Sequence, residues 1–261
     1  MQTGKPIEIH GKPVGGGKFP LICTPLVGRS HDQVLLEVQL VLAKKPDLLE
    51  WRVDFFQGIG HSDEVLALAS SIRQAAGAVP LLFTRRSIRE GGQKISLSEE
   101  AVVALYAAVC ESRSVDIVDF EMSNDPAHTA LVREVARAND TKLILSFHDF
   151  HATPTLAVLN QRFLQAQELG GDIAKVAVMP RHLEDVLTLL SATLQSSQKL
   201  AIPLVSMSLG AYGSLTRLFG WAFGSAMTFA IGANSSAPGQ VPIEDLQTVL
   251  GIVQQSLAGK E

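Results

Sequence analysis

The sequence contains little cysteine, and its two cysteines form no pattern typical of a cross-linked or metal-bound protein. Cys23 and Cys110 lie far apart in a chain of 261 residues, without a CxxC pair and without a histidine at ligand spacing. A disulfide-stapled secreted domain and a zinc module are therefore disfavoured. We expect two buried apolar side chains in a reduced compartment, and no metal site.

Long apolar runs and an excess of one charge are also lacking. No uninterrupted apolar segment reaches the roughly 18 residues needed to cross a bilayer, and the first residues lack the apolar stretch of a signal peptide. A formal net charge of −4 gives no reason to expect nucleic acid or an acidic membrane surface as a partner. Because 46% of the residues are hydrophobic and 18% are charged, we expect a globular, cytoplasmic protein.

Short apolar runs recur along the chain at spacings of about thirty residues, the length of one strand with its crossover helix. Between them stand segments with the apolar period of a helix. The eight runs are residues 19–24, 48–53, 81–84, 115–120, 143–147, 173–178, 203–207 and 226–231. No low-complexity linker divides them, so we expect one domain over residues 1–261.

Several of the intervening segments carry helix start and stop signals. Ser96 has capping-box spacing to Glu99, and Gly77 is placed to end the helix before it. Asp125-Pro126 and Thr153-Pro154 each place a capping residue before a proline at the first helical position.

Eight alternations of strand and helix predict a parallel sheet closed into a (β/α)8 barrel, the TIM barrel. Residues 1–18, with Gly11 and Gly15 to Gly17, are expected to form a hairpin before the first barrel strand. The alternative is an open doubly wound sheet. It would be expected to show a glycine-rich dinucleotide loop after the first strand, and residues 23–28 do not form one. No phosphate-loop frame fits residues 15–19 either.

Polar residues stand at the carboxyl ends of several predicted strands, where barrel enzymes place their catalytic groups. Glu50, Arg52 and Asp54 alternate along the second strand and would share one face, where charges must be paired or must serve a ligand. A structural ion-pair network stays open for Asp54. Arg85 and Arg86 follow the third strand, and the sequence does not decide which of them points inward.

Lys175, inside the apolar sixth strand, is the most informative residue of the chain. Lysine is rarely buried without a purpose, and burial favours the neutral amine that imine formation requires. The alternative is a lysine that reaches from the strand to pair with a carboxylate. His148 closes the neighbouring fifth strand and is a candidate general acid or base, whereas His151 is expected at the surface.

The loops after the last two strands are rich in serine and glycine and contain Arg217, Ser236 and Gln240. The corresponding loops of barrel enzymes often bind anions, so these residues are candidates to hold an anionic substrate group.

Six segments that contain these residues follow one another along nearly the whole chain. They are 50–54 (EWRVD), 86–87 (RS) with 90–92 (EGG), 148–150 (HDF) with 153–154 (TP), 175–180 (KVAVMP), 206–208 (SMS) with Arg217, and 236–240 (SAPGQ). In this order and spacing they resemble type I 3-dehydroquinate dehydratase, the Schiff-base class of this shikimate-pathway enzyme. The resemblance implies a lyase that converts 3-dehydroquinate to 3-dehydroshikimate without metal or organic cofactor, working as a homodimer.

The resemblance also implies a role for each site residue. Lys175 would form an imine with the ring ketone, His148 would move the protons, and Glu90 would orient His148. The remaining positions match residues that bind the substrate. They are Arg217 for the carboxylate, Ser236 and Gln240 in a lid, Glu50, Arg52 and Arg86 for ring hydroxyls or support of the lysine, and Thr24, where related sequences often carry serine.

Two other functions are weighed against this one. A Schiff-base aldolase on the same barrel would also use a lysine in the sixth strand, but it would be expected to show a glycine-rich phosphate loop after the seventh or eighth strand. A catalytically silent barrel kept as a ligand-binding module should have lost Lys175 or His148, and this chain has both.

Overall fold

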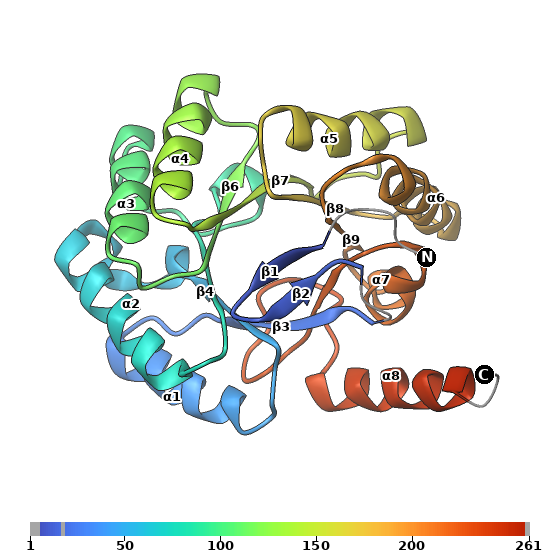
Figure 1. Ribbon diagram of the computed structural model, residues 1–261, viewed down its shortest axis with the longest axis horizontal. Coiled ribbons are helices and arrows are strands. Elements are labelled where there is room, and N and C mark those ends of the chain that lie inside the picture. Colours follow the sequence, from blue (N-terminus) through green and yellow to red (C-terminus); the bar gives the residue numbers. More distant parts are fainter. Residues whose placement is uncertain (1–5, 17–18, 259–261) are drawn as a thin grey trace.

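Eight parallel strands form the centre of the computed structural model, which describes residues 6–16 and 19–258 (Figure 1). They are β3 (Leu21–Leu26), β4 (Leu48–Arg52), β5 (Leu81–Thr84), β6 (Ile117–Glu121), β7 (Lys142–Asp149), β8 (Ile173–Val178), β9 (Leu204–Ser208) and β10 (Met227–Phe229). Each strand pairs with the next, and β10 pairs with β3. A parallel bridge between Leu204 and Ser225 joins the two ends of the sheet. The predicted barrel is confirmed, and the doubly wound alternative is wrong.

Eight α-helices in the described part of the chain surround the strands. They are α1 (His31–Leu42), α2 (Ser62–Ala76), α3 (Glu99–Glu111), α4 (Pro126–Ala138), α5 (Leu156–Glu168), α6 (Leu183–Lys199), α7 (Gly213–Phe219) and α8 (Ile243–Ala258). Short 3-10 turns lie at Val53–Phe55, Gln57–Gly60, Ile88–Glu90 and Gly220–Phe223. Among the described residues, no helix is long and apolar enough to cross a membrane.

Two of the predicted helix signals are confirmed and two are displaced. Asp125 caps α4 with Pro126 in its first turn, and Gly77 ends α2. The cap of α3 is Ser98, whose hydroxyl accepts from the amide of Ala101, so the prediction of Ser96 is wrong. Helix α5 is capped by Thr155, not Thr153. Thr153 instead donates its hydroxyl to the carbonyl of Met179 at 3.1 Å, which ties the β7–α5 loop to the end of β8.

The predicted N-terminal hairpin closes one end of the barrel. Strands β1 (Ile7–Ile9) and β2 (Lys12–Val14) pair antiparallel, and Ile9 and Val14 are buried against the inward-facing side chains Leu48 and Leu82. The hairpin therefore covers the amino-terminal end of the strands. The rest of the predicted extension, residues 1–5 and 17–18, lies outside the described residues.

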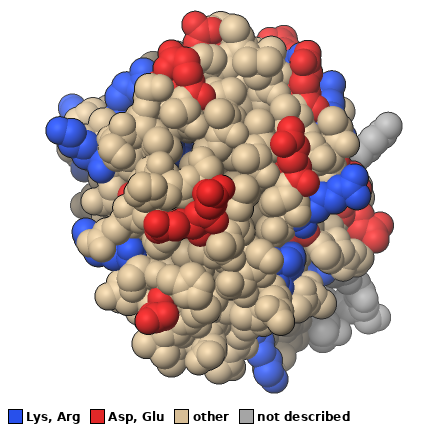
Figure 2. Space-filling model, turned by 90° about the vertical axis from the view of Figure 1, so that its left-hand side faces the viewer, with Lys and Arg blue, Asp and Glu red and all other residues tan. Residues whose placement is uncertain are grey.

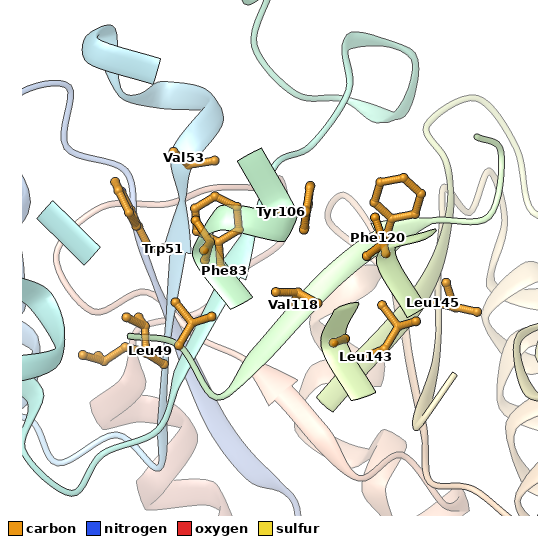
Figure 3. Close-up of a cluster of buried hydrophobic side chains, with 14 of the residues drawn as sticks. Leu49, Trp51, Val53, Phe83, Tyr106, Val118, Phe120, Leu143 and Leu145 are labelled. Atoms are coloured by element: carbon orange, nitrogen blue, oxygen red, sulfur yellow. The ribbon is translucent and has the colours of Figure 1, made fainter. Parts of the chain in front are cut away.

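A row of aromatic rings fills the space between the strands and helices α2 and α3 (Figure 3). Trp51, Phe83, Tyr106 and Phe120 meet edge to face, with ring centroids 5.3–5.6 Å apart. The Tyr106 hydroxyl accepts from the amide of Arg85 at 3.0 Å and donates to the carbonyl of Asp119 at 2.6 Å. This layer therefore fixes the carboxyl ends of β5 and β6 relative to each other.

Charged side chains are scattered over the outside. On the face shown in Figure 2, acidic and basic residues lie among uncharged ones, and neither sign covers a large continuous area. Both cysteines are buried, as expected, Cys23 inside the barrel and Cys110 on the buried face of α3. Burial raises the pKa of both thiols, so neither is poised to act as a thiolate.

Replacing Phe83 with alanine is expected to lower the free energy of unfolding by about 3–5 kcal/mol, because the ring is fully buried between two aromatic neighbours. Urea unfolding followed by tryptophan fluorescence measures this loss. Phe83→Leu, which keeps most of the volume, should lose less than half as much. A loss below about 1 kcal/mol for the alanine variant would show that this layer does not hold the strands.

Candidate active site

A pocket opens at the carboxyl end of the strands. Nine of the ten site residues predicted from the sequence line it: Glu50, Arg52, Arg86, Glu90, His148, Lys175, Arg217, Ser236 and Gln240. Glu50 and Arg52 lie on β4, His148 on β7 and Lys175 on β8. Arg86 and Glu90 follow β5, Arg217 lies on helix α7, and Ser236 and Gln240 follow β10. Apolar walls are added by Phe150, Ala177, Met207, Leu209 and Phe229. This combination of charged groups and apolar walls suits a small polar molecule.

Thr24 is the predicted site residue that the structure does not bring to the pocket. Successive side chains of a strand point to opposite faces, and its neighbour Cys23 faces the barrel interior. The Thr24 side chain therefore points outward, where it lies against the backbone of Gly232. The hydroxyl is buried and has no hydrogen-bond partner among the described residues.

Lys175 is buried in the barrel interior, as its place in an apolar strand predicts. Its Nζ lies 2.8 Å from Asp119 Oδ2 and 3.7 Å from Glu50 Oε1, and 4.5 Å from the centre of the Phe229 ring. Two carboxylates therefore lie close enough to form ion pairs with this buried amine. The carboxylate partner named in the alternative is present, but the amine lies inside the barrel and does not reach out of the strand to meet it.

Asp119 and Glu121 are site residues that the sequence interpretation missed. Both lie on β6, two positions apart, and both are buried. The signal was available, since alternation along β6 places Ile117, Asp119 and Glu121 on one face. A buried strand whose inward positions end in two carboxylates indicates a charged site, as it did for Glu50 and Arg52 on β4.

Arg86, rather than Arg85, points into the barrel. Its guanidinium lies 2.8 Å from Asp119 Oδ1 and donates to Glu121 Oε1 at 3.1 Å. Burial alone would raise the pKa of Asp119, but the cations of Arg86 and Lys175 outweigh burial and hold that pKa well below its usual range. Arg85 instead pairs with Glu99 at the start of α3.

His148 and Glu90 form a close pair at the pocket wall. Glu90 Oε2 lies 2.8 Å from His148 Nδ1 and accepts from the backbone amide of His148 at 3.0 Å. Burial, then the cations of Arg86 and Lys175, lower the pKa of His148 well below its usual value, so the imidazole is neutral at pH 7. With Glu90 as the carboxylate, Nδ1 donates to it and Nε2 is left to accept a proton.

The carboxyl group of Glu90 has a pKa close to neutral pH. Burial and the neighbouring carboxylate of Glu121 raise the pKa of Glu90 to about 7, while Arg86 and a hydrogen bond from Ser123 oppose the rise. The Ser123 hydroxyl donates to Glu90 Oε1 at 2.6 Å from the loop after β6.

Two glycines shape the loop that carries Glu90. Gly91 has φ +83°, and a side chain there would collide with the ring of Phe150. A Cβ on Gly92 would lie 2.0 Å from the carbonyl oxygen of Arg86. The two glycines therefore allow a sharp turn that returns the chain so that Glu90 faces His148.

Arg217 is a buried cation without a carboxylate partner among the described residues. Its guanidinium donates to the carbonyls of Phe229 at 3.3 Å and Pro238 at 3.4 Å, and its Nε has no partner within the same residues. Burial lowers the pKa of Arg217 to about 10, so it still carries a charge at pH 7. An unpaired charge in the wall of a pocket favours binding of an anion there.

The loop of residues 235–240 lies over the pocket. The Gln240 side chain accepts from the amide of Ser236 at 2.9 Å and donates to the Ser236 hydroxyl at 3.2 Å, which folds the loop on itself. Arg52 Nη1 donates to the carbonyl of Ser236 at 3.5 Å. His151, expected at the surface, is exposed. In the described part of the chain, no group of three or more His, Cys, Asp or Glu side chains is arranged to hold a metal ion.

A (β/α)8 barrel whose pocket, at the carboxyl ends of the strands, is lined by a buried lysine, a histidine and a buried arginine has the arrangement of a barrel enzyme. Residues 22–257 match the sequence profile of type I 3-dehydroquinase. The chain belongs to this family, whose members are hydro-lyases.

Individual relatives agree with the family match. The chain is 63% identical over 257 residues to 3-dehydroquinate dehydratase of Albidiferax ferrireducens, covering 98% of this chain and 97% of the relative. The crystal structure of 3-dehydroquinate dehydratase from Geobacillus kaustophilus matches with a TM-score of 0.95 at 48% identity, covering 98% and 99%. A Clostridium difficile type I enzyme, described with covalent modified comenic acid, matches with a TM-score of 0.93 at 34% identity, covering 97% and 100%.

Removal of the Ser123 hydroxyl is expected to move the acid limb of the pH–activity profile upward. The hydrogen bond stabilises the carboxylate of Glu90, so Ser123→Ala raises the pKa of Glu90 further above about 7. At a given pH, a smaller fraction of Glu90 is then ionised and able to orient His148. We expect a shift of roughly half a pH unit in kcat/KM, since solvent replaces part of the lost bond.

Ser123→Thr, which keeps a hydroxyl, is the matched control and should leave the profile in place. An acid limb of Ser123→Ala that coincides with the wild-type limb would contradict the assignment of this limb to Glu90.

Proposed function

We propose that the chain dehydrates 3-dehydroquinate to 3-dehydroshikimate through an imine on Lys175, with His148 as general acid and base. The observation that carries the proposal is the position of the Lys175 amine at the floor of a pocket whose wall holds a neutral imidazole and the unpaired cation of Arg217. The relatives reported above are 3-dehydroquinate dehydratases, and their activity supports this substrate.

Substrate binding follows from the charges of the pocket. Arg217 would bind the substrate carboxylate, because this guanidinium lacks an anionic partner among the described residues. Ser236 and Gln240 would close over the ring from the loop above it. Arg52 would bind a ring hydroxyl from the pocket wall, and Glu50 would support Lys175 at 3.7 Å.

Imine formation begins when Lys175 passes a proton to the neutral imidazole of His148, which returns it to the hydroxyl of the adduct when water leaves. Asp119, the nearest carboxylate, holds the ammonium in place until the ketone has bound, and the free amine then adds to the ketone carbon. Loss of water leaves a protonated imine whose positive charge draws electrons from the adjacent C–H bond. The covalently modified ligand of the Clostridium difficile relative supports a nucleophile in such a pocket.

Elimination then uses His148 twice. Nε2 removes the proton beside the imine carbon, and the electron pair forms an enamine. The enamine expels the hydroxyl group one carbon further on, and the imidazolium returns the proton so that water leaves. A second water hydrolyses the imine, releasing the enone product and the Lys175 amine. Glu90 keeps Nδ1 protonated throughout, so Nε2 stays directed at the substrate.

The contacts of Arg217 also separate this function from that of an aldolase acting on sugar phosphates. Its guanidinium meets the loop after β10 through the single carbonyl of Pro238. One buried arginine suits a carboxylate better than a phosphate, which barrel enzymes hold with several backbone amides. Within the cell we propose a homodimer in the cytoplasm, acting in the shikimate pathway, by resemblance to the family.

Borohydride reduction in the presence of 3-dehydroquinate is expected to attach the ligand to Lys175, because reduction traps an imine as a stable amine. Mass spectrometry of peptides should find the added mass on the peptide that contains Lys175. Lys175→Ala should lose both the adduct and turnover. Turnover without any adduct on Lys175 would overturn the imine mechanism.

His148→Ala is expected to separate imine formation from turnover. Borohydride should still trap the imine on Lys175, while kcat falls by about 10²–10⁴-fold because the positioned base is gone. The rate is followed by the absorbance of the enone product. His151→Ala, in the exposed loop nearby, serves as the control and should keep the wild-type kcat. A nearly active His148→Ala variant would contradict the role given to His148.

A further inference from the structure

Asp54 is a buried carboxylate beside the pocket to which the proposed chemistry gives no role. Its side chain is fully buried in the 3-10 turn after β4. Both of its oxygens are engaged by the guanidinium of Arg52, Nε to Oδ1 at 2.8 Å and Nη2 to Oδ2 at 2.9 Å. Such a two-point pair fixes the plane of the guanidinium as well as its position.

The same carboxylate also holds the chain segment that carries Glu90. The backbone amide of Arg86 donates to Oδ1 at 3.3 Å, and the amide of Gln93 donates to Oδ2 at 3.0 Å. These amides stand before and after Glu90. Asp54 therefore accepts four hydrogen bonds, two from the pocket wall of β4 and two from the loop after β5.

We infer that Asp54 is a positioning residue that aligns Arg52 for the substrate and joins it to the loop carrying Glu90. The guanidinium nitrogen that does not contact Asp54 is Nη1. It lies in the pocket wall and donates to the Ser236 carbonyl at 3.5 Å. Asp54 thus sets where the loop of residues 235–240 meets the pocket. This inference rests on the proposed function, because the role of Arg52 in substrate binding comes from it.

Asparagine at position 54 tests the inference because it has the same shape but one acceptor oxygen. Its NH₂ group would face an N–H of Arg52 or Gln93, and the charge that pairs with Arg52 would be gone. We expect Asp54→Asn to raise KM for 3-dehydroquinate by about tenfold, with a smaller change in kcat.

Asp116→Asn is the matched control. Asp116 also pairs with an arginine, Arg73 at 2.5 Å, and accepts a backbone amide, that of Leu81 at 2.6 Å, but it lies at the opposite end of the barrel. Both variants should lower Tm. Only Asp54→Asn should change KM. If Asp54 contributed to stability alone, both variants would keep the wild-type KM.

A double-mutant cycle with Arg52→Ala decides whether Asp54 acts through Arg52. In the Arg52→Ala background, Asp54→Asn should change KM by less than about twofold and should raise Tm, because it removes an unpaired buried charge. If Asp54→Asn alone does not fold, the KM of the double variant can still be compared with that of Arg52→Ala.

The outcomes separate the inference from the proposed function. A wild-type chain that does not turn over 3-dehydroquinate would overturn the proposed function. An active wild type with an Asp54→Asn variant of unchanged KM, or with KM effects that multiply in the double variant, would overturn the role of Asp54 alone.

Discussion

The buried charge chain from Arg86 through Asp119 to Lys175 is the interaction on which the rest of the site depends. Three charged groups lie in the interior of an apolar barrel, where an isolated charge would be too costly to keep. Asp119 lies 2.8 Å from each cation, so it compensates both. The amine can therefore be held at the floor of the pocket without unfolding the strands around it.

The arginines of the pocket differ in their partners, and this difference gives them different roles. Arg52 and Arg86 are held by carboxylates of the protein, so their positions are set before any ligand arrives. Arg217 is buried as deeply but contacts carbonyl oxygens. An anionic ligand would supply the anionic partner that Arg217 lacks among the described residues, which gives the pocket a preferred orientation for a carboxylate.

Protonation in the pocket follows from the same charges. Burial, together with the cations that hold Asp119 ionised, lowers the pKa of His148 and keeps it neutral, and Glu90 next to it titrates near pH 7. One imidazole can then take up a proton and return it. The histidine and the lysine stand on adjacent strands, β7 and β8, so both reach the same bound ring.

The fold and most of the pocket could be predicted because both follow from local patterns. Eight apolar runs with intervening helical segments determined the barrel, and polar residues at strand ends marked nine of the residues that line the pocket. Thr24 does not line the pocket. Its substrate-binding role was taken from the resemblance, without regard to the alternation that turns its side chain outward. Asp119 and Glu121 were missed although the same alternation could have marked them.

By itself, the sequence determined the class of fold, the buried lysine and the histidine near it, since burial and periodicity are properties of short segments. The tertiary structure alone decided which charges are partners. Asp119 and Lys175 are far apart in the chain, and their pairing depends on the register of β6, β7 and β8. The lysine is therefore predictable from its strand, but its carboxylate partners and the unpaired state of Arg217 exist only once the barrel has closed.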